Sequence, residues 1–432
     1  MTLGRHADFN RLWAGQTASN FGDKISVLAL PTIAVVVLGG GAFEVGLLGA
    51  LRFVPFFVFA PIVGIVADRF PRRSIMIAAD VGRLLALASI PVAFMFDGLT
   101  IAQLYVVAGA TGILTTFFEI SYQSYLPSLI GRENLVEGNT KLQVSRSLAE
   151  VAGAGIGGAL MQFFGAARAI ALDAVTYVVS LVCLLTIKHR EDREELRANH
   201  ANALEDMKEG FRTLFGTSTL RGLFFSSSIV NLGAAMGDAL LLVYAYTVLG
   251  LSPGQVGIAA AVGAAFVIVG AILSSKVVEV FTLGRTLVLT AVVLGAGYAL
   301  LPYAGVALAF AGLIIIQAVI GFVSPMYDIH VLTLVQNVTP NKLMGRVSGT
   351  ALAAVYGALG LGYSIGGTVG EFAGLTTGLL LAGAVAALGG LTLLASPVAA
   401  MRAHPAQAED ETDEEEPREG GEALVPGSRA TE

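Results

Sequence analysis

The chain turns sharply at residues 64–73, which read Gly64-Ile65-Val66-Ala67-Asp68-Arg69-Phe70-Pro71-Arg72-Arg73. An apolar run that begins at Val45 stops in this cluster of one acid and three arginines, and a second apolar run begins at Ser74. Pro71 cannot continue a helix, so it helps to end the first one, and Gly64 lets two helix backbones approach closely. The stretch therefore predicts a helical hairpin that turns at a membrane surface.

The composition supports the same interpretation. The chain has 432 residues, of which 55% are apolar and only 13% charged, and a soluble protein of this size would not hide so much apolar surface. Its formal net charge of -6 comes largely from the acidic run at residues 409–416. Nothing in the rest of the chain suggests a nucleic-acid partner. Cys183, the single cysteine, excludes an internal disulfide. The polar amino terminus shows no cleavable signal pattern.

Twelve apolar segments are long enough to cross a bilayer. The first expected span ends near residue 38 and the second near residue 67. The following ten cover residues 74–96, 100–126, 139–164, 169–187, 219–249, 253–278, 285–303, 306–335, 344–370 and 376–401. A long polar stretch, residues 188–217, separates the sixth span from the seventh. Within it, apolar side chains recur at helical spacing from Ala203 to Phe215, which predicts an amphipathic surface helix.

The second half of the chain repeats the first. Residues 112–158 match residues 321–367 at a constant offset, and the first spans of the two halves also match. The matched acids are Glu119 with Asp328 and Asp23 with Asp238. Two six-helix halves in the same orientation are typical of transporters whose substrate site lies between the halves.

The predicted fold class is therefore an all-α membrane protein of twelve transmembrane helices in two pseudo-symmetric six-helix bundles. The expected domains are the bundles at residues 1–187 and 219–402, a cytoplasmic linker at 188–218 and a disordered acidic tail at 403–432. Lysine and arginine concentrate in alternate loops, which places both termini in the cytoplasm and the protein in the inner or plasma membrane.

The pattern Gly-x-x-x-Asp-Arg-x-x-Arg-Arg at residues 64–73 closely resembles the signature loop between transmembrane helices 2 and 3 of the major facilitator superfamily. The segments at residues 11–16, 22–23, 30–31 and 122–127 resemble a branch of drug and metabolite exporters that includes macrolide-efflux and enterobactin (siderophore) exporters. The resemblance implies the fold of that superfamily. It also implies a gating motif made of Gly64, Asp68, Arg69, Arg72 and Arg73.

The resemblance extends to the fifth span. Gly153, Gly157 and Gly158 keep the small-residue face of the family's helix-5 motif, which predicts close helix packing. Ala154 stands where the antiporter signature has proline. The support that this helix gives to antiport is therefore weakened, although the small-residue face is kept.

Ionisable residues inside the spans are the candidate site. A charge at mid-bilayer costs about 3 kcal/mol on insertion scales, so each one needs a partner or a function. The candidates for proton coupling and substrate contact are Asp23, Glu119, Asp238, Asp328 and Arg52. The resemblance implies that the helices of the four acids line a central cavity. Burial disfavours the charged form of a carboxyl, as proton coupling requires.

Asp23 is the first choice for the proton and Glu119 the second. The alternative is that these acids only pair with Lys24, Arg52 or Arg146 and hold helices together.

Other charges have structural interpretations. Asp80 and Arg83 are expected to join Arg72 in a surface cluster. Two further pairs are expected, Arg146 with Glu150 on the fifth span and Asp173 with Arg168 near the outer side. Aromatic residues that could wall a cavity for bulky substrates are Phe117, Phe118, Tyr122, Tyr125, Tyr244, Tyr246 and Tyr327.

These observations favour a secondary active transporter, a proton-coupled efflux antiporter for a bulky amphipathic small molecule. The alternatives are a symporter or importer of a small metabolite with the same fold, and a membrane-embedded sensor or enzyme. The sequence has no phosphate-binding loop and no metal-binding cluster, so we expect no catalysis, no metal and no cofactor. The expected partners are a small-molecule substrate, protons and the lipid bilayer, with the protein acting as a monomer.

Overall fold

A computed structural model describes residues 6–189, 191, 203–303, 308–340 and 343–404, and these residues form helices without strands. The helices of the first half are α1 (Ala7–Thr32), α2 (Ala42–Arg69), α3 (Arg72–Met95), α4 (Ile101–Ile130), α5 (Leu135–Phe164) and α6 (Ala166–Thr186). Those of the second half are α9 (Ser218–Thr247), α10 (Pro253–Phe281), α11 (Leu283–Leu300), α12 (Ala309–Val338), α13 (Met344–Phe372) and α14 (Leu375–Thr392).

Within the described part of the chain, twelve helices are long and apolar enough to cross a membrane. The first of them continues α1 through a short π-helix, Ile33–Val37. The predicted surface helix is confirmed as α8 (Ala203–Gly216), which leads into α9. The acidic tail after residue 404 lies outside the described residues.

Local sequence explains where several helices begin and end. Thr100 begins α4 by accepting a hydrogen bond from the Gln103 N–H at 3.3 Å, and Ser252 begins α10 in a reciprocal capping box with Gln255. Gly131 and Gly165 end α4 and α5 with positive φ values of 76° and 83°, a conformation that glycine adopts without strain. The spans therefore stop close to the polar or glycine-containing turns expected from the sequence.

The two halves pack in the same way. In the first half α6 packs against α1 and α3, and in the second half α14 packs against α9 and α11. The pair α3 and α4 likewise corresponds to α11 and α12. This correspondence gives the internal repeat a structural basis.

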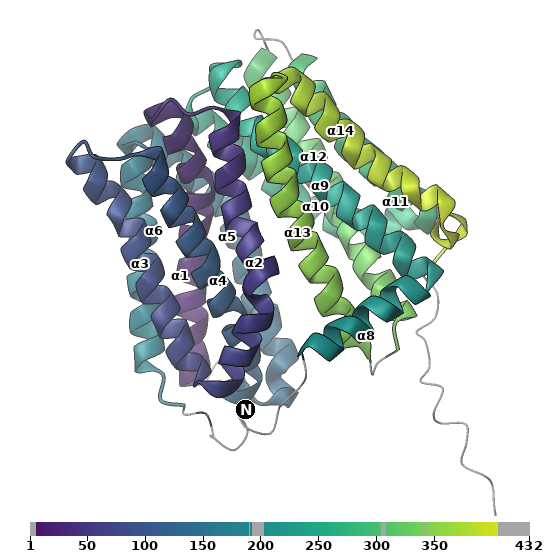
Figure 1. Cartoon of the computed structure of the whole chain (residues 1–432), viewed down its shortest axis with the longest axis horizontal. Helices are drawn as coiled ribbons and strands as arrows, with labels where there is room; N and C mark the ends of the chain where they lie inside the picture. The colour runs from purple at the N-terminus through teal and green to yellow at the C-terminus, as the bar shows by residue number, and fades with distance from the viewer. Residues whose placement is uncertain (1–5, 190, 192–202, 304–307, 341–342, 405–432) are drawn as a thin grey trace, which may run out of the picture.

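The halves contact each other mainly through two helix pairs, α2 with α13 and α5 with α10, and less extensively between α2 and α9. A Cβ atom at Gly46 would lie 2.6 Å from Gly367 Cα, and one at Gly158 would lie 2.5 Å from Gly257 Cα. These glycines lie on the side of the molecule away from α8, which we call the far side. On the opposite side, the linker side, the halves diverge toward α8 (Figure 1).

The expectation of a close approach at Gly64 is wrong for this conformation. Gly64 lies near the linker-side end of α2, and a Cβ atom there would meet nothing within 4 Å. In the described part of the chain, neither a neighbouring helix of the same half nor a helix of the other half comes within contact distance of that position.

Candidate functional site

The arginines of the α2–α3 turn contact their own half of the molecule. The Arg72 guanidinium donates to the Ser124 carbonyl at 3.0 Å. The Arg73 guanidinium donates to the carbonyls of Leu184 at 2.8 Å and Leu185 at 3.0 Å. The turn is therefore held against the linker-side ends of α4 and α6. Arg69 is exposed, and the Asp68 side chain lies outside the described part of the structure.

Glu191, in the linker, also holds this turn. Its carboxylate accepts a hydrogen bond from the Arg73 N–H at 3.4 Å and lies 3.6 Å from the Arg72 guanidinium. The side chain is only 5% exposed, and burial raises the pKa of Glu191 against the lowering effects of the Arg73 N–H and the Arg72 charge. The sequence did not single out Glu191, because it lies in a polar stretch rich in charges.

Asp23 lies within α1 and is half-buried. Its Oδ1 accepts a hydrogen bond of 2.5 Å from the Tyr177 hydroxyl of α6. The preceding Gly22 lies directly against the Asp173 carboxyl and the Thr176 hydroxyl, since a Cβ atom there would overlap both. The small residue therefore lets α1 approach the polar face of α6.

The expected surface cluster of Asp80 and Arg83 and the expected pairing of Asp173 with Arg168 are both wrong. Asp80 and Arg83 form an ion pair inside the first half, where Asp80 is fully buried and Arg83 is 3% exposed. The Ser180 hydroxyl donates to the other Asp80 oxygen at 2.7 Å. Asp173 is also fully buried and accepts from Ser26 instead of pairing with Arg168.

The Arg83 guanidinium lies between two aromatic rings, 4.3 Å from the Phe118 centroid and 4.6 Å from the Tyr177 centroid. Such cation–π contacts help to compensate for the lost hydration of a buried guanidinium. We call Asp23, Asp80, Arg83, Asp173 and Tyr177 the N-half cluster.

Glu119 of α4 lies 3.7 Å from the Arg146 guanidinium of α5, and both side chains are partly exposed. Lys24 of α1 forms a 2.6 Å ion pair with Glu150 of α5. The two charges on α5 therefore contact different neighbouring helices, where the sequence predicted that they pair with each other. Ion pairs therefore connect α5 to both α1 and α4.

Asp238 and Arg52 lie in the middle of α9 and α2 and are exposed. The Tyr298 hydroxyl donates to Asp238 Oδ1 at 2.7 Å. Tyr363 of α13 lies within electrostatic reach of both Asp238 and Arg52, so these groups from the two halves lie near one another. Asp328, in α12, is exposed and has no hydrogen bond or ion pair with the described residues.

Most of the expected aromatic wall is buried among helices. Phe118, Tyr122, Tyr125, Tyr244 and Tyr327 are each at most 8% exposed.

A different aromatic group joins the two halves where α2 meets α13. Phe56 stacks on Tyr356 with ring centroids 4.1 Å apart, and Phe53 stacks on Tyr363 at 5.6 Å. The repeat could not have found these rings, because it matches α2 with α10 and α5 with α13 and does not match α2 with α13.

The α5 glycines pack closely on two helices. Gly153 and Gly157 face α1, where a Cβ atom would lie 2.8 Å from Lys24 Cβ and 3.3 Å from Ile25 Cα. Gly158 instead faces Gly257 of α10, in the other half. The small-residue face therefore joins the halves on the far side, which agrees with the predicted packing.

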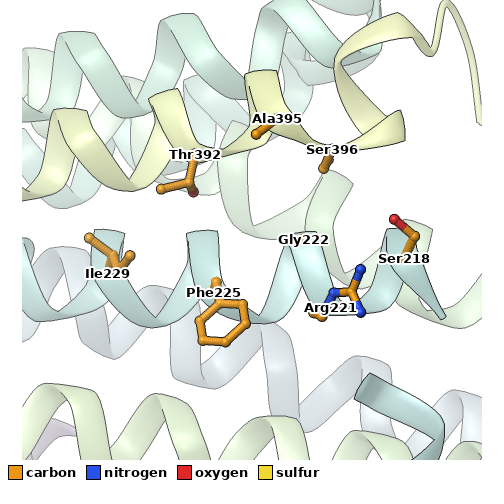
Figure 2. Close-up of a pocket in the computed structure, with 8 residues that line it drawn as sticks. All are labelled: Ser218, Arg221, Gly222, Phe225, Ile229, Thr392, Ala395 and Ser396. Carbon is orange, nitrogen blue, oxygen red and sulfur yellow. The ribbon is translucent and has the colours of Figure 1, made fainter. Parts of the chain in front are cut away.

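A separate pocket of about 340 Å³ lies at the linker-side ends of α9 and α14 (Figure 2). Its lining residues are Ser218, Arg221, Gly222, Phe225, Ile229, Thr392, Ala395 and Ser396. None of the candidate site residues lines it, so the pocket is distinct from the acids described above.

Comparison with known proteins now gives the family. The sequence model of the Major Facilitator Superfamily matches residues 12–360. The chain belongs to this superfamily. As a member it is a multi-pass membrane transporter and not an enzyme, and such proteins carry small molecules.

Several relatives are similar at low identity and agree with the predicted resemblance. The multidrug efflux pump Tap of Mycolicibacterium fortuitum is 25% identical over 378 residues, 84% of this chain and 89% of Tap. The enterobactin exporter EntS of Salmonella typhi is 24% identical over 336 residues, 75% of this chain and 78% of EntS. Macrolide efflux protein A of Streptococcus pyogenes is 23% identical over 206 residues, 48% of this chain and 51% of that protein.

Solved structures confirm the fold. A mutant of the nucleoside transporter NupG superposes with a TM-score of 0.77 at 12% identity and covers 90% of this chain and 99% of its own. A D-xylose–proton symporter superposes with a TM-score of 0.65 at 15% identity, over 89% of this chain and 97% of its own. At this identity the likeness concerns the fold alone.

Proposed function

We propose that this transporter is a proton-coupled exporter of bulky amphipathic small molecules that works by alternating access. The observation that carries the proposal is the similarity to Tap and EntS, which are named as an efflux pump and an exporter and which match over most of their length. Acids in the middle of α1, α4, α9 and α12 supply groups that can take up and release protons.

The proposal also assigns an orientation. The loops on the linker side carry most of the lysine and arginine, which supports a cytoplasmic location for that side and both termini. The contacts between the halves on the far side then close the outer face, and the divergence on the linker side (Figure 1) makes this the conformation open to the cytoplasm. We propose a monomer in the plasma membrane, because each chain has both halves of a two-bundle transporter.

In this conformation substrate enters between the halves from the cytoplasm. Glu119, Asp238 and Asp328 are each at least partly exposed, and Arg52 and Arg146 supply positive charge. Asp23 is the acid that exchanges a proton with water in this space. Closure on the linker side would bring α2 and its turn, with Gly64, Asp68 and the three arginines, toward the other half. Opening of the α2–α13 and α5–α10 contacts would then release substrate outside.

Inverted membrane vesicles, in which the cytoplasmic face is outside, test the direction and the coupling. The vesicles are loaded with acid inside, and uptake is measured for a macrolide, a catechol siderophore and a lipophilic dye. The proposal expects uptake that follows the imposed pH gradient and stops when the gradient is dissipated. Uptake that is insensitive to the gradient, or outward movement under it, would contradict an exporter driven by protons.

A further inference from the structure

The N-half cluster contains more acid than base. Asp23 of α1, Asp80 of α3 and Asp173 of α6 face one guanidinium, that of Arg83. The nearest other charges are engaged elsewhere, because Lys24 pairs with Glu150 and Glu119 pairs with Arg146. Fully ionised, the cluster would carry two uncompensated negative charges inside the bundle. Buried charges without partners are too costly to persist, so the cluster needs a bound proton.

The hydrogen bonds show which carboxyl can hold it. Asp80 is paired with Arg83 and accepts from Ser180. Asp23 is half-buried and is the acid of the cluster that water can reach. Asp173 is fully buried, and its side-chain partners are two neutral hydroxyls, those of Ser26 and Thr176.

The Thr176 hydroxyl has a single hydrogen, and it has two acceptors to choose from. It lies 2.7 Å from the Asp173 backbone carbonyl and 3.2 Å from Asp173 Oδ1. If the hydrogen goes to the nearer carbonyl, Oδ1 is left facing an oxygen lone pair. A proton on Oδ1 removes this conflict, since Oδ1–H donates to Thr176 Oγ1 while Ser26 donates to Oδ2. Every polar group around Asp173 is then satisfied.

Water has no room at this carboxyl. Gly22 lies against Asp173 Oδ1 so closely that even a Cβ atom would overlap it. The neighbouring Thr176 and Ser26 fill other sides. Proton exchange at Asp173 therefore requires α1 and α6 to separate.

We infer that Asp173 carries an occluded proton in this conformation, in a site between α1 and α6 that lies apart from the substrate contacts between the halves. Its role in transport rests on the proposed function. In that role one proton binds Asp173 from the outer side and leaves it to the cytoplasm. Asp23, which accepts a hydrogen bond from Tyr177 in the same cluster, is the acid that exchanges this proton with water. Substrate and proton then do not compete for one carboxyl.

Infrared difference spectroscopy of the purified full-length protein, taken between neutral and alkaline pH, tests the proton directly. A protonated carboxylic acid has a carbonyl stretch that is separate from that of a carboxylate and moves in heavy water. The wild type should show this band at neutral pH and Asp173→Asn should lack it. Asp238→Asn, which removes an acid from α9 in the other half, is the matched control and should keep it. A wild type without the band, or an unchanged band in Asp173→Asn, would overturn the inference.

Ser26→Ala provides a second test that does not depend on removing the acid. Ser26 donates to the carbonyl oxygen of the protonated Asp173, so its loss should move the band to higher frequency while the protein stays folded. An unmoved band would assign the proton to another group and overturn the inference.

The transport assay then separates the two proposals. If wild-type export follows the pH gradient, Asp173→Asn should lose uphill export and keep downhill equilibration, and normal pH-driven export by this variant would overturn the coupling role. If wild-type movement ignores the gradient, the proposed function fails, while the infrared band alone still decides whether Asp173 holds a proton.

Discussion

The same trio of helices is built differently in the two halves. In the first half α1, α3 and α6 meet around the Asp80–Arg83 ion pair and the buried Asp173. In the second half α9, α11 and α14 meet through small residues. Gly390 would place a Cβ atom 2.5 Å from the Ala291 side chain, and Gly389 would place one 2.6 Å from the Val230 nitrogen. Helix α14 has no charged residue at all.

The difference shows that the packing does not require charge at this position. Close glycine and alanine contacts are enough to hold membrane helices together, and the second half uses them. Buried charges are costly in a membrane protein and commonly mark function. The repeat therefore contrasts a half that buries ionisable groups with a half whose acids, Asp238 and Asp328, are exposed, and the following experiments test that contrast.

The largest effect should come from breaking the buried ion pair. Arg83→Gln leaves Asp80 buried without a cation, which typically costs about 3–5 kcal/mol, so the variant should unfold at much lower temperature in detergent. The double variant Asp80→Asn with Arg83→Gln removes both charges and should recover much of the loss. A single variant as stable as wild type would show that the pair contributes nothing to the first half.

The next effect concerns the matched acids of α1 and α9. Asp23→Asn mimics a permanently protonated acid and should lose uphill, pH-driven export while it retains downhill equilibration. Asp238→Asn should be less damaging, because Asp238 is exposed and its hydrogen-bond partner is the neutral Tyr298 hydroxyl, whereas Asp23 belongs to a cluster of three acids. Both are compared by dye uptake into inverted vesicles. Equal loss in both variants would show that the halves share the proton, and full activity of Asp23→Asn would make it a packing residue.

The fold could be predicted because its signals are local. Apolar runs about the thickness of a bilayer, the α2–α3 turn and the constant repeat offset are all properties of neighbouring residues. The four acids could be placed on their helices for the same reason. Their roles remain predictions.

The partners could not be predicted, because they depend on which helix faces lie together. Asp80 lies only six residues after Ser74, so the sequence placed it near the membrane surface. Its burial with Arg83 could be predicted only if α6 were known to cover this face of α3. Asp173 was assigned to Arg168 by proximity in the chain, while its partner Ser26 is 147 residues away. Periodicity alone does not identify such contacts.

A smaller effect is expected from alanine at the glycines that precede the matched acids. Gly22→Ala would drive a methyl group into the Asp173 carboxyl and the Thr176 hydroxyl, and Gly237→Ala would drive one into the Tyr298 ring. Overpacking of this kind costs about 1–3 kcal/mol. We expect the Gly22 variant to lose more thermal stability, since it disturbs hydrogen bonds as well as packing. A larger loss in the Gly237 variant would place the tighter constraint in the second half.

The smallest effect concerns how each half holds its linker-side turn. In the second half, backbone hydrogen bonds hold the turn. The Leu283 N–H donates to the Arg402 carbonyl at 3.2 Å and the Gly284 N–H donates to the Met401 carbonyl at 3.0 Å. In the first half, the Glu191 carboxylate contacts Arg72 and Arg73. Glu191→Gln keeps an acceptor for the Arg73 N–H and loses only the Arg72 attraction, and ion pairs near a surface contribute about 0–1 kcal/mol.

The pH dependence of this variant's stability shows whether the Glu191 charge stabilises or destabilises the folded protein. Burial raises the pKa of Glu191 in the folded protein, so the folded state holds the proton more readily than the unfolded state. Wild-type stability should then fall slightly as pH rises from the unfolded value of 4.5 through the raised folded pKa. Glu191→Gln cannot ionise, so in thermal unfolding it should match wild type in mild acid and be slightly more stable at neutral pH. A variant that is less stable at neutral pH would show that the Arg72 attraction outweighs burial, and that charge holds the turn of the first half as firmly as backbone bonds hold that of the second.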